Sequence, residues 1–104
     1  MLHVIATIEL KPGKRETFLA AFRDLAPKVH AEAGCIEYGL TEDVETGLPP
    51  QGPVRKDVLT IVERWESLDH LRAHLAAPHM ADWGKKVGGL RSGVKLQVLA
   101  PVKG

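Results

Sequence analysis

The amino-acid sequence predicts one α+β domain, in which a four-stranded antiparallel sheet carries helices on one face. The first observation is the order of the segments, because patterns typical of strand, helix, strand, strand, helix and strand follow one another along the chain. The second is that the first and third strand segments are apolar on both faces, as expected of the central strands of a ferredoxin-like β-α-β-β-α-β fold. With 104 residues, the chain has the length of a single domain spanning residues 1–104.

Composition and charge argue against several classes of function. The chain has 14 Lys and Arg residues and 13 Asp and Glu residues, so its net charge of +1 offers no strong field for nucleic acid or anionic membranes. No stretch approaches the roughly 20 apolar residues of a membrane span. The single cysteine, Cys35, cannot form an internal disulfide, which fits a reducing compartment. We therefore expect a cytoplasmic protein that binds neither nucleic acid nor membranes.

The N-terminal third of the chain predicts a strand followed by an amphipathic helix. Residues Leu2–Leu10 alternate in hydropathy, and Pro12 and Gly13 end this strand. Pro12 suits the start of a helix, where the first N–H groups have no partner within the helix. Apolar side chains then recur at spacings of four, three and four: Phe18, Phe22, Leu25 and Val29. Pro27 lies within this pattern and is expected to kink the helix, which ends before Gly34.

The middle of the chain predicts two strands joined by a long irregular connection. The second strand is expected over Cys35–Asp43 and the third over Val58–Trp65, and one face of the second strand carries Ile36, Tyr38 and Leu40. Between them, Val44–Asp57 contains three prolines and two glycines, a composition that excludes a regular ladder. Long connections usually have a role, so we expect a mobile segment that borders the functional site or reaches a partner subunit.

The C-terminal third predicts a helix in two pieces and a last strand. Ser67 suits the N-cap of the first piece, and three leucines form its expected buried stripe: Leu68, Leu71 and Leu75. Pro78 interrupts the pattern and begins a second helical piece that ends near Val87, before two glycines. Residues Val94–Ala100 complete the set of elements as the last strand.

The chain contains five histidines, and two of them, His70 and His74, stand four residues apart on one helical face, a spacing that suggests a metal site. No HExxH pattern or third ligand accompanies them, so we expect no metal site and a solvent-facing His70. His74 borders the apolar stripe of the helix. It is therefore expected to be partly buried and able to accept a proton or to donate a hydrogen bond to a bound oxygen. The alternative is a structural histidine that only holds the helix in place.

Aromatic residues are expected to gather near these histidines, between the sheet and the helices. Trp65 ends a central strand, Trp83 lies on the last helical piece, and Tyr38 belongs to the second strand. His79 follows the Pro78 break and can approach from the next helical turn. Together these side chains suggest a pocket for a small aromatic molecule, and ordinary core packing is the alternative.

The face of the sheet that the helices leave open also needs an explanation. The two central strands are apolar on that face too, and Ile5 and Thr7 represent it on the first strand. Two sheets packed face to face in a homodimer would cover it. The alternative is an ordinary sheet with scattered exposed apolar residues.

Two segments carry a resemblance to a known family. EAGCIEYGL (Glu32–Leu40) after the amphipathic helix, and ERWESLDHLRAHLAAPHM (Glu63–Met80), resemble the antibiotic biosynthesis monooxygenase family over nearly the whole chain. The resemblance implies a single domain that forms a dimeric α/β barrel. It also implies oxidation of quinols or polycyclic phenols by molecular oxygen, without metal, flavin or haem.

The resemblance further implies roles for particular residues. His74 would act as base or as donor to an oxyanion, Trp65 and Tyr38 would orient the substrate ring, and His79 and Trp83 would complete the binding site. The family also contains relatives that degrade haem, so a second hypothesis is a haem oxygenase with His74 or His79 as axial ligand. A third reading is a binding module without catalysis. The segment Val44–Asp57 is longer than in the shorter members of the family. The resemblance therefore does not define the size of the pocket mouth or the identity of the substrate.

Overall fold

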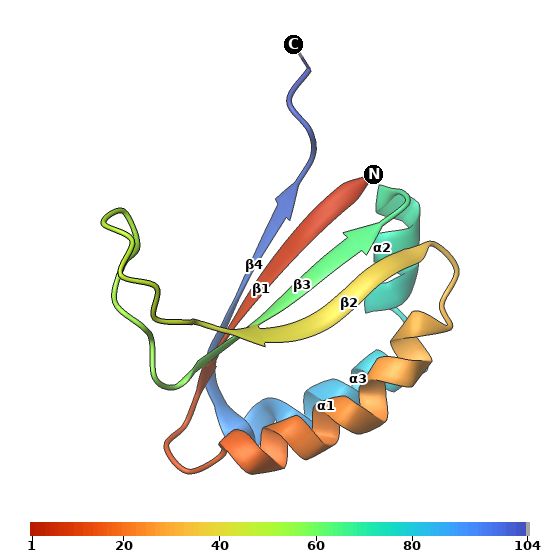
Figure 1. Ribbon diagram of the computed structural model, residues 1–104. Helices are drawn as coiled ribbons and strands as arrows, with labels where there is room; N and C mark the ends of the chain where they lie inside the picture. Colours follow the sequence, from red (N-terminus) through yellow and green to blue (C-terminus); the bar gives the residue numbers. More distant parts are fainter. Residues whose placement is uncertain (104) are drawn as a thin grey trace.

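The structure, a computed structural model, describes residues 1–103 and contains one four-stranded sheet with the strand order β2-β3-β1-β4 (Figure 1). β1 (Leu2–Leu10) and β3 (Val58–Trp65) are the central strands, whereas β2 (Cys35–Glu42) and β4 (Arg91–Leu99) form the edges. All neighbouring strands are antiparallel. The expected sheet, with its two central strands apolar on both faces, is thus confirmed.

Three helices lie on one face of this sheet. They are α1 (Arg15–His30), α2 (Leu68–Leu75) and α3 (Pro78–Val87), and a short 3-10 turn, Gly88–Leu90, leads into β4. The chain order is therefore β-α-β-β-α-α-β, the ferredoxin-like pattern with its second helix divided at Pro78 as expected. No helix within residues 1–103 is long and apolar enough to cross a membrane.

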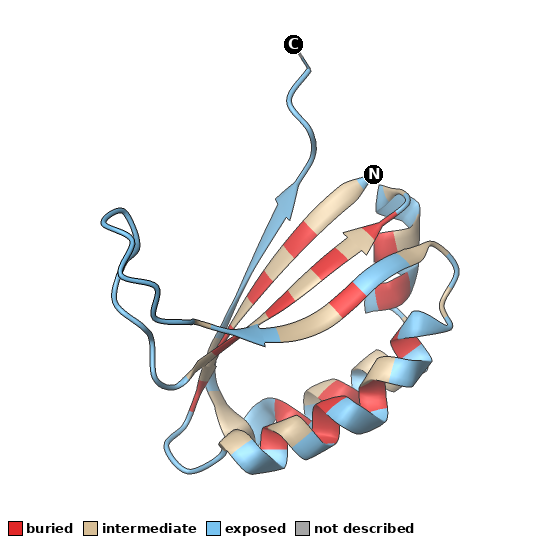
Figure 2. Ribbon diagram, viewed as in Figure 1, coloured by how far each residue is buried: buried red, intermediate tan, exposed pale blue. Residues whose placement is uncertain are grey.

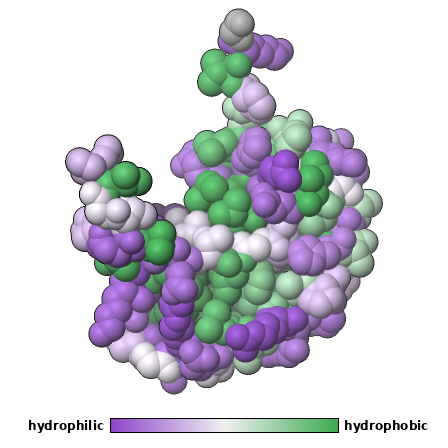
Figure 3. Space-filling view, viewed as in Figure 1, coloured by the Kyte–Doolittle hydropathy of each residue, from purple (hydrophilic) through white to green (hydrophobic). Residues whose placement is uncertain are grey.

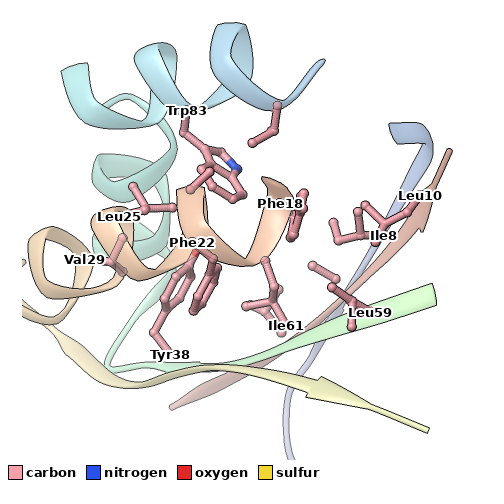
Figure 4. Packing of buried hydrophobic residues seen from close by; sticks show 14 of the residues in the cluster. Ile8, Leu10, Phe18, Phe22, Leu25, Val29, Tyr38, Leu59, Ile61 and Trp83 are labelled. Atoms are coloured by element: carbon pink, nitrogen blue, oxygen red, sulfur yellow. The ribbon is translucent and has the colours of Figure 1, made fainter. Parts of the chain in front are cut away.

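The hydrophobic core lies between the sheet and α1 (Figure 4). Along β1 and β3 every second residue is buried, and Figure 2 shows this alternation as red bands on the two central strands. The expected stripe of α1 faces these strands and is buried: Phe18, Phe22, Leu25 and Val29. Trp83 of α3 joins it edge to face, with ring centroids 5.2 Å from Phe18 and 6.1 Å from Phe22.

The expected stripe on α2 is wrong in two of its three positions. Leu68 and Leu75 are 46% and 54% exposed, whereas Leu71 and His74 are buried. The expectation rested on hydropathy, which favours leucines in buried positions. An imidazole can also be buried when its ring nitrogen is hydrogen-bonded, and His74 is hydrogen-bonded to Glu32. Leu75, one residue further on, instead lines an open pocket.

Three other elements differ in detail from their expected bounds. Ile36 is exposed rather than aligned with Tyr38, because an irregularity in β2 pairs Cys35 with Trp65 and Glu37 with Arg64. α1 begins at Arg15, because Lys11 to Lys14 form a turn in which Gly13 has a φ of 76°, and it continues through Pro27. The last strand begins at Arg91 and ends at Leu99 rather than covering residues 94–100.

Val44–Asp57 is exposed along its whole length and contains no helix or strand, as its composition predicted. It projects from one end of the sheet in Figure 1. Arg55 closes its base with three bonds to Asp43: Nε to Oδ2 at 2.8 Å, Nη2 to Oδ1 at 2.9 Å and the backbone N–H to Oδ2 at 2.9 Å. These hydrogen bonds lower the pKa of Asp43 to about 2. Whether the segment is mobile stays a prediction.

The edge strand β4 leaves apolar side chains exposed on both faces. Val94, Leu96 and Val98 are paired with Ile8, Ala6 and Val4 and therefore share the helix-side face, yet they are 40–47% exposed. Figure 3 shows hydrophobic patches among hydrophilic side chains on the visible face of the molecule. The helices cover the sheet only in part, and the uncovered part of the helix-side face borders the pocket described next.

Candidate active site

A pocket of about 270 Å³ opens between the sheet and helices α2 and α3. Its walls are mainly apolar and come from all four strands and both of these helices, including Ile8, Ile61, Met80, Trp83 and Leu96. Four polar side chains also reach it: Tyr38, Glu63, His74 and Arg91. An apolar cavity with a few convergent polar groups is the usual form of a small-molecule site.

His74 is a buried imidazole in the lining of this pocket. The residue is 1% exposed, and its Nδ1 lies 2.9 Å from Oε2 of Glu32. A carboxylate only accepts hydrogen bonds, so Nδ1 carries the proton and Nε2 keeps its lone pair. Within residues 1–103 no hydrogen bond to Nε2 is found, and since no buried side-chain nitrogen there lacks a partner, Nε2 is open to the pocket that His74 lines. His74 therefore presents a free proton acceptor to the pocket and a carboxylate partner behind it.

Glu32 reaches His74 from the turn between α1 and β2. Gly34 shapes this turn with a φ of 79°, and a Cβ on it would come within 2.3 Å of the His70 ring. Only glycine therefore fits between the turn and α2. The turn directs Glu32 toward both α2 and α3, because its Oε2 is also 2.8 Å from Nε2 of His79.

Glu63 and Trp65 form a second polar pair next to His74. The indole Nε1 of Trp65 donates to Oε1 of Glu63 at 2.9 Å, and the Trp65 ring centroid lies 4.6 Å from that of His74. Burial raises the pKa of Glu63, although the bond from Trp65 and the nearby imidazole of His74 oppose this shift. Glu63 is therefore a carboxyl group that holds its proton more tightly than an exposed one.

Tyr38 and Cys35 are both held in their neutral forms. Burial, together with the nearby carboxylates, raises the pKa of Tyr38, and its ring lies 5.6 Å from that of His74 and stacks on Phe22. Tyr38 therefore remains a phenol that can donate a hydrogen bond. Burial also raises the pKa of the Cys35 thiol, which disfavours a nucleophilic role.

The structure places the residues expected from the sequence in three positions. His74, Tyr38 and Trp83 line the pocket together. Trp65 is fully buried behind His74 and does not line the pocket. His79 lies outside it, in a groove between α1 and α3, and joins the site only through Glu32.

Sequence reasoning missed Glu32, Glu63 and Arg91 as members of the site. Glu63 had a readable signal, since a carboxyl residue stands in the buried face of a central strand between Ile61 and Trp65. Glu32 had none, because its partner His74 is 42 residues away. Within residues 1–103, no group of three or more His, Cys, Asp or Glu side chains is arranged to hold a metal ion.

Comparisons with known proteins agree with this fold. The family model for antibiotic biosynthesis monooxygenases matches residues 1–86. The chain is 36% identical over 103 residues to the "Probable quinol monooxygenase YgiN" of Escherichia coli K12, covering 97% of this chain and 98% of that protein.

Solved structures show the same fold. Rv0793 from Mycobacterium tuberculosis superposes with a TM-score of 0.80 at 28% identity, covering 99% of this chain and 96% of its own. PA3566 from Pseudomonas aeruginosa superposes with a TM-score of 0.79 at 26% identity, covering 98% and 94%. The chain therefore belongs to the antibiotic biosynthesis monooxygenase family, and its family and its relatives support a monooxygenase activity.

Proposed function

We propose that this protein is a cytoplasmic, cofactor-independent monooxygenase that oxidises a quinol or a polycyclic phenol with molecular oxygen. The observation that carries the proposal is the buried His74, which keeps Nε2 free at the pocket while Glu32 accepts from Nδ1. This arrangement suits a general base for an acidic O–H or C–H group.

The walls of the pocket favour a flat, apolar substrate. Trp83, Met80 and Ile61 offer aromatic and apolar contact area, and the pocket volume of about 270 Å³ is near the lower end for small-molecule sites. Tyr38, as a neutral phenol, can donate a hydrogen bond to a substrate oxygen. Few polar groups line the pocket, so a quinol ring would lose most of its contact with water on binding.

The chemistry starts with proton transfer from the quinol to Nε2 of His74. The imidazolium that forms is stabilised by Glu32, and the quinolate is rich enough in electrons to reduce oxygen. In balance, one quinol and one O₂ give one hydroxylated quinone and one water. Trp65 supports this step from behind, because it packs on His74 and bonds Glu63.

Homodimer formation is part of the proposal. On the face of the sheet opposite the helices, Ile5 of β1 is paired with Val62 of β3, and both are only half-buried in the single chain. A second sheet packed on this face would cover them.

An oxygen electrode tests the proposal. Purified protein without added cofactor is mixed with quinols, anthrones and flavonols, and we expect oxygen consumption above the non-enzymatic rate for at least one class. Binding of these compounds without any oxygen uptake would favour a non-catalytic binding module. A Soret shift with added haemin that is lost in His74→Ala would favour a haem enzyme instead.

A further inference from the structure

We propose that Arg91 binds an anionic group of the substrate, and that the substrate is therefore a quinol or polycyclic phenol with a carboxylate on a side chain. This inference rests on the proposed function, because it specifies the substrate class of the same pocket. It assigns a binding role to a residue that lines the pocket but has no part in the proton transfer to His74. Arg91 also lies beyond residues 1–86, the part of the chain that the family model matches.

Arg91 brings a positive charge without a partner to an apolar pocket. The residue is only partly exposed, and it lines the pocket together with Val94 and Leu96 of the same strand. Within residues 1–103, its guanidinium forms no ion pair and no side-chain hydrogen bond, and no buried side-chain nitrogen lacks a partner, so its N–H groups are accessible. An arginine side chain is always charged and has five N–H donors. A partly buried guanidinium of this kind is a binding site for an anion.

The strand register places Arg91 and Glu63 at opposite ends of the pocket. Glu63 is paired with Val4 of β1, whereas Arg91 is paired with Leu10. Val4 and Leu10 are six residues apart on β1, which corresponds to about 20 Å along the strand. Figure 1 shows the same separation, since β4 begins at the end of the sheet opposite α2, the helix that carries His74. The pocket therefore has one polar end around His74 and Glu63 and another at Arg91.

Between these two ends the pocket is apolar. The residues of the sheet that line this middle part all lie on the helix-side face: Ala6, Ile8, Ile61, Val94 and Leu96. Met80 and Trp83 of α3 complete its walls. Such walls suit the apolar body of an aromatic ligand. A ligand that uses the whole pocket therefore has its ring hydroxyl near His74 and its anionic group on an arm several bonds away.

The charges around Arg91 favour a ligand with a single negative charge. Among the described residues that line the pocket, Arg91 is the one arginine and there is no lysine. A single guanidinium balances one negative charge and can bind both oxygens of a carboxylate through two parallel N–H bonds. A phosphate monoester carries nearly two charges near neutral pH, so part of its charge would stay unbalanced among apolar side chains.

The carboxylates nearest to this end of the pocket do not compete for the guanidinium. Glu63, the acidic residue in the lining, lies at the other end. Glu9, next to Leu10 on β1, pairs instead with Lys95, at 4.0 Å. A carboxylate of the substrate is then the counter-ion that Arg91 lacks, and its binding fixes the end of the substrate that points toward His74.

A binding measurement that needs no turnover tests the inference. The probes are a naphthoquinone with a butanoic acid side chain and the primary amide of the same compound, which has nearly the same shape but no charge. In calorimetric titrations, wild-type protein should bind the acid about 10- to 100-fold more tightly than the amide, as expected for hydrogen bonds to a charged group. Arg91→Gln should bind the acid no more tightly than the amide, and its affinity for the amide should equal that of wild-type protein.

Arg72→Gln provides the matched control. Arg72 lies on α2 outside the pocket, is 69% exposed and pairs with Asp69, so this variant should keep the full preference for the acid. Arg91→Lys keeps the charge but not the two-pronged geometry, so it should keep part of the preference. It also serves as the test variant if Arg91→Gln does not fold.

Three results would overturn the proposal. The first is equal binding of acid and amide by wild-type protein, or binding of neither at millimolar concentration. The second is a preference for the acid that survives in Arg91→Gln, because another group would then bind the carboxylate. The third is an equal loss of both ligands in folded Arg91→Gln, because Arg91 would then shape the pocket rather than bind an anion.

Oxygen uptake with the quinols of the two probes separates this inference from the proposed function. Arg91→Gln should raise KM for the acid quinol by the same factor as in the binding measurement and leave kcat nearly unchanged, because His74 lies at the other end of the pocket. A preference for the acid in binding without any oxygen uptake would support the role of Arg91 and contradict the proposed function. Oxygen uptake with equal KM for the acid and amide quinols in wild-type protein would support the proposed function and overturn the inference.

Discussion

Trp65 acts on the site through a hydrogen bond rather than through the substrate. Its indole N–H is the only donor that the described residues provide to the buried carboxyl of Glu63. Trp65→Phe should therefore lower the free energy of unfolding by about 1 to 3 kcal/mol, the cost of a buried acceptor left unpaired. It should also lower kcat more than it raises KM, since Trp65 supports His74 and does not line the pocket. Thermal melting and steady-state kinetics check both effects, and unchanged stability would contradict the geometry.

Glu63 gives the protein a pH dependence with a definite sign. The pKa of Glu63 is raised in the folded protein, so the native state binds the carboxyl proton more tightly than the unfolded chain does. In the unfolded chain the pKa of this carboxyl is about 4.3. The stabilising effect is present below that value and is lost as the pH rises through the folded pKa. Glu63→Gln lacks this loss, so its melting temperature relative to wild-type should increase as the pH rises from 4 to 7. A difference that stays constant over this range would contradict the shift.

At the level of single elements, Val44–Asp57 is a connection that the core does not use. Every residue in it is exposed, and its hydrogen bonds lie within the segment, as from Gln51 to Val44, or at its base, where Arg55 pairs with Asp43. A variant in which residues 46–52 are replaced by Gly-Gly should therefore keep its circular dichroism and melt within a few degrees of wild-type. Loss of cooperative unfolding in this variant would show that the segment is structural.

The elements also show where the sequence is sufficient and where it is not. The stripe of α1 and the alternation of β1 were predictable, because burial of apolar side chains follows the helix and strand periods. Partial burial of His74 was predicted from its place beside the apolar stripe, but its full burial was not, because that depends on a bond to Glu32 from a turn far away in the sequence. Ile36 was misplaced because one irregular residue in a strand shifts the side chains around it, and nothing local marks that residue.

The candidate site, too, was predictable from the sequence only in part. His74, Tyr38 and Trp83 were predicted to gather, and they line one pocket. The carboxylates that give the histidines their chemistry were not predicted, because a pair formed across the fold leaves no spacing signal in the sequence. The positions of Trp65 and His79 were not predictable either. Trp65 packs on His74 without lining the pocket, and His79 joins the site only through Glu32.

For the whole molecule, the central prediction is a homodimer. The outer face of the sheet holds Ile5 and Val62 at its centre, and covering it adds a hydrophobic term that is large beside the few kcal/mol of a small domain's stability. Two chains of 11.4 kDa should give a mass of about 23 kDa by light scattering at micromolar concentration. Ile5→Arg should yield monomers of lower melting temperature, whereas an Ala20→Arg control on the exposed side of α1, across the sheet from that face, should remain dimeric. A monomeric wild-type protein would contradict this reading.

The most direct test of the account follows oxygen from ¹⁸O₂ into the product. With a quinol that supports oxygen uptake and without added cofactor, wild-type protein should place one ¹⁸O atom in the oxidised product and release the other as water. His74→Ala should keep its fold and lose about a hundredfold to ten-thousandfold in rate, the usual contribution of a general base. Its melting temperature should change far less than the rate suggests, because His79 still bonds Glu32. Full activity in a folded His74→Ala protein, or a product without ¹⁸O, would contradict the account.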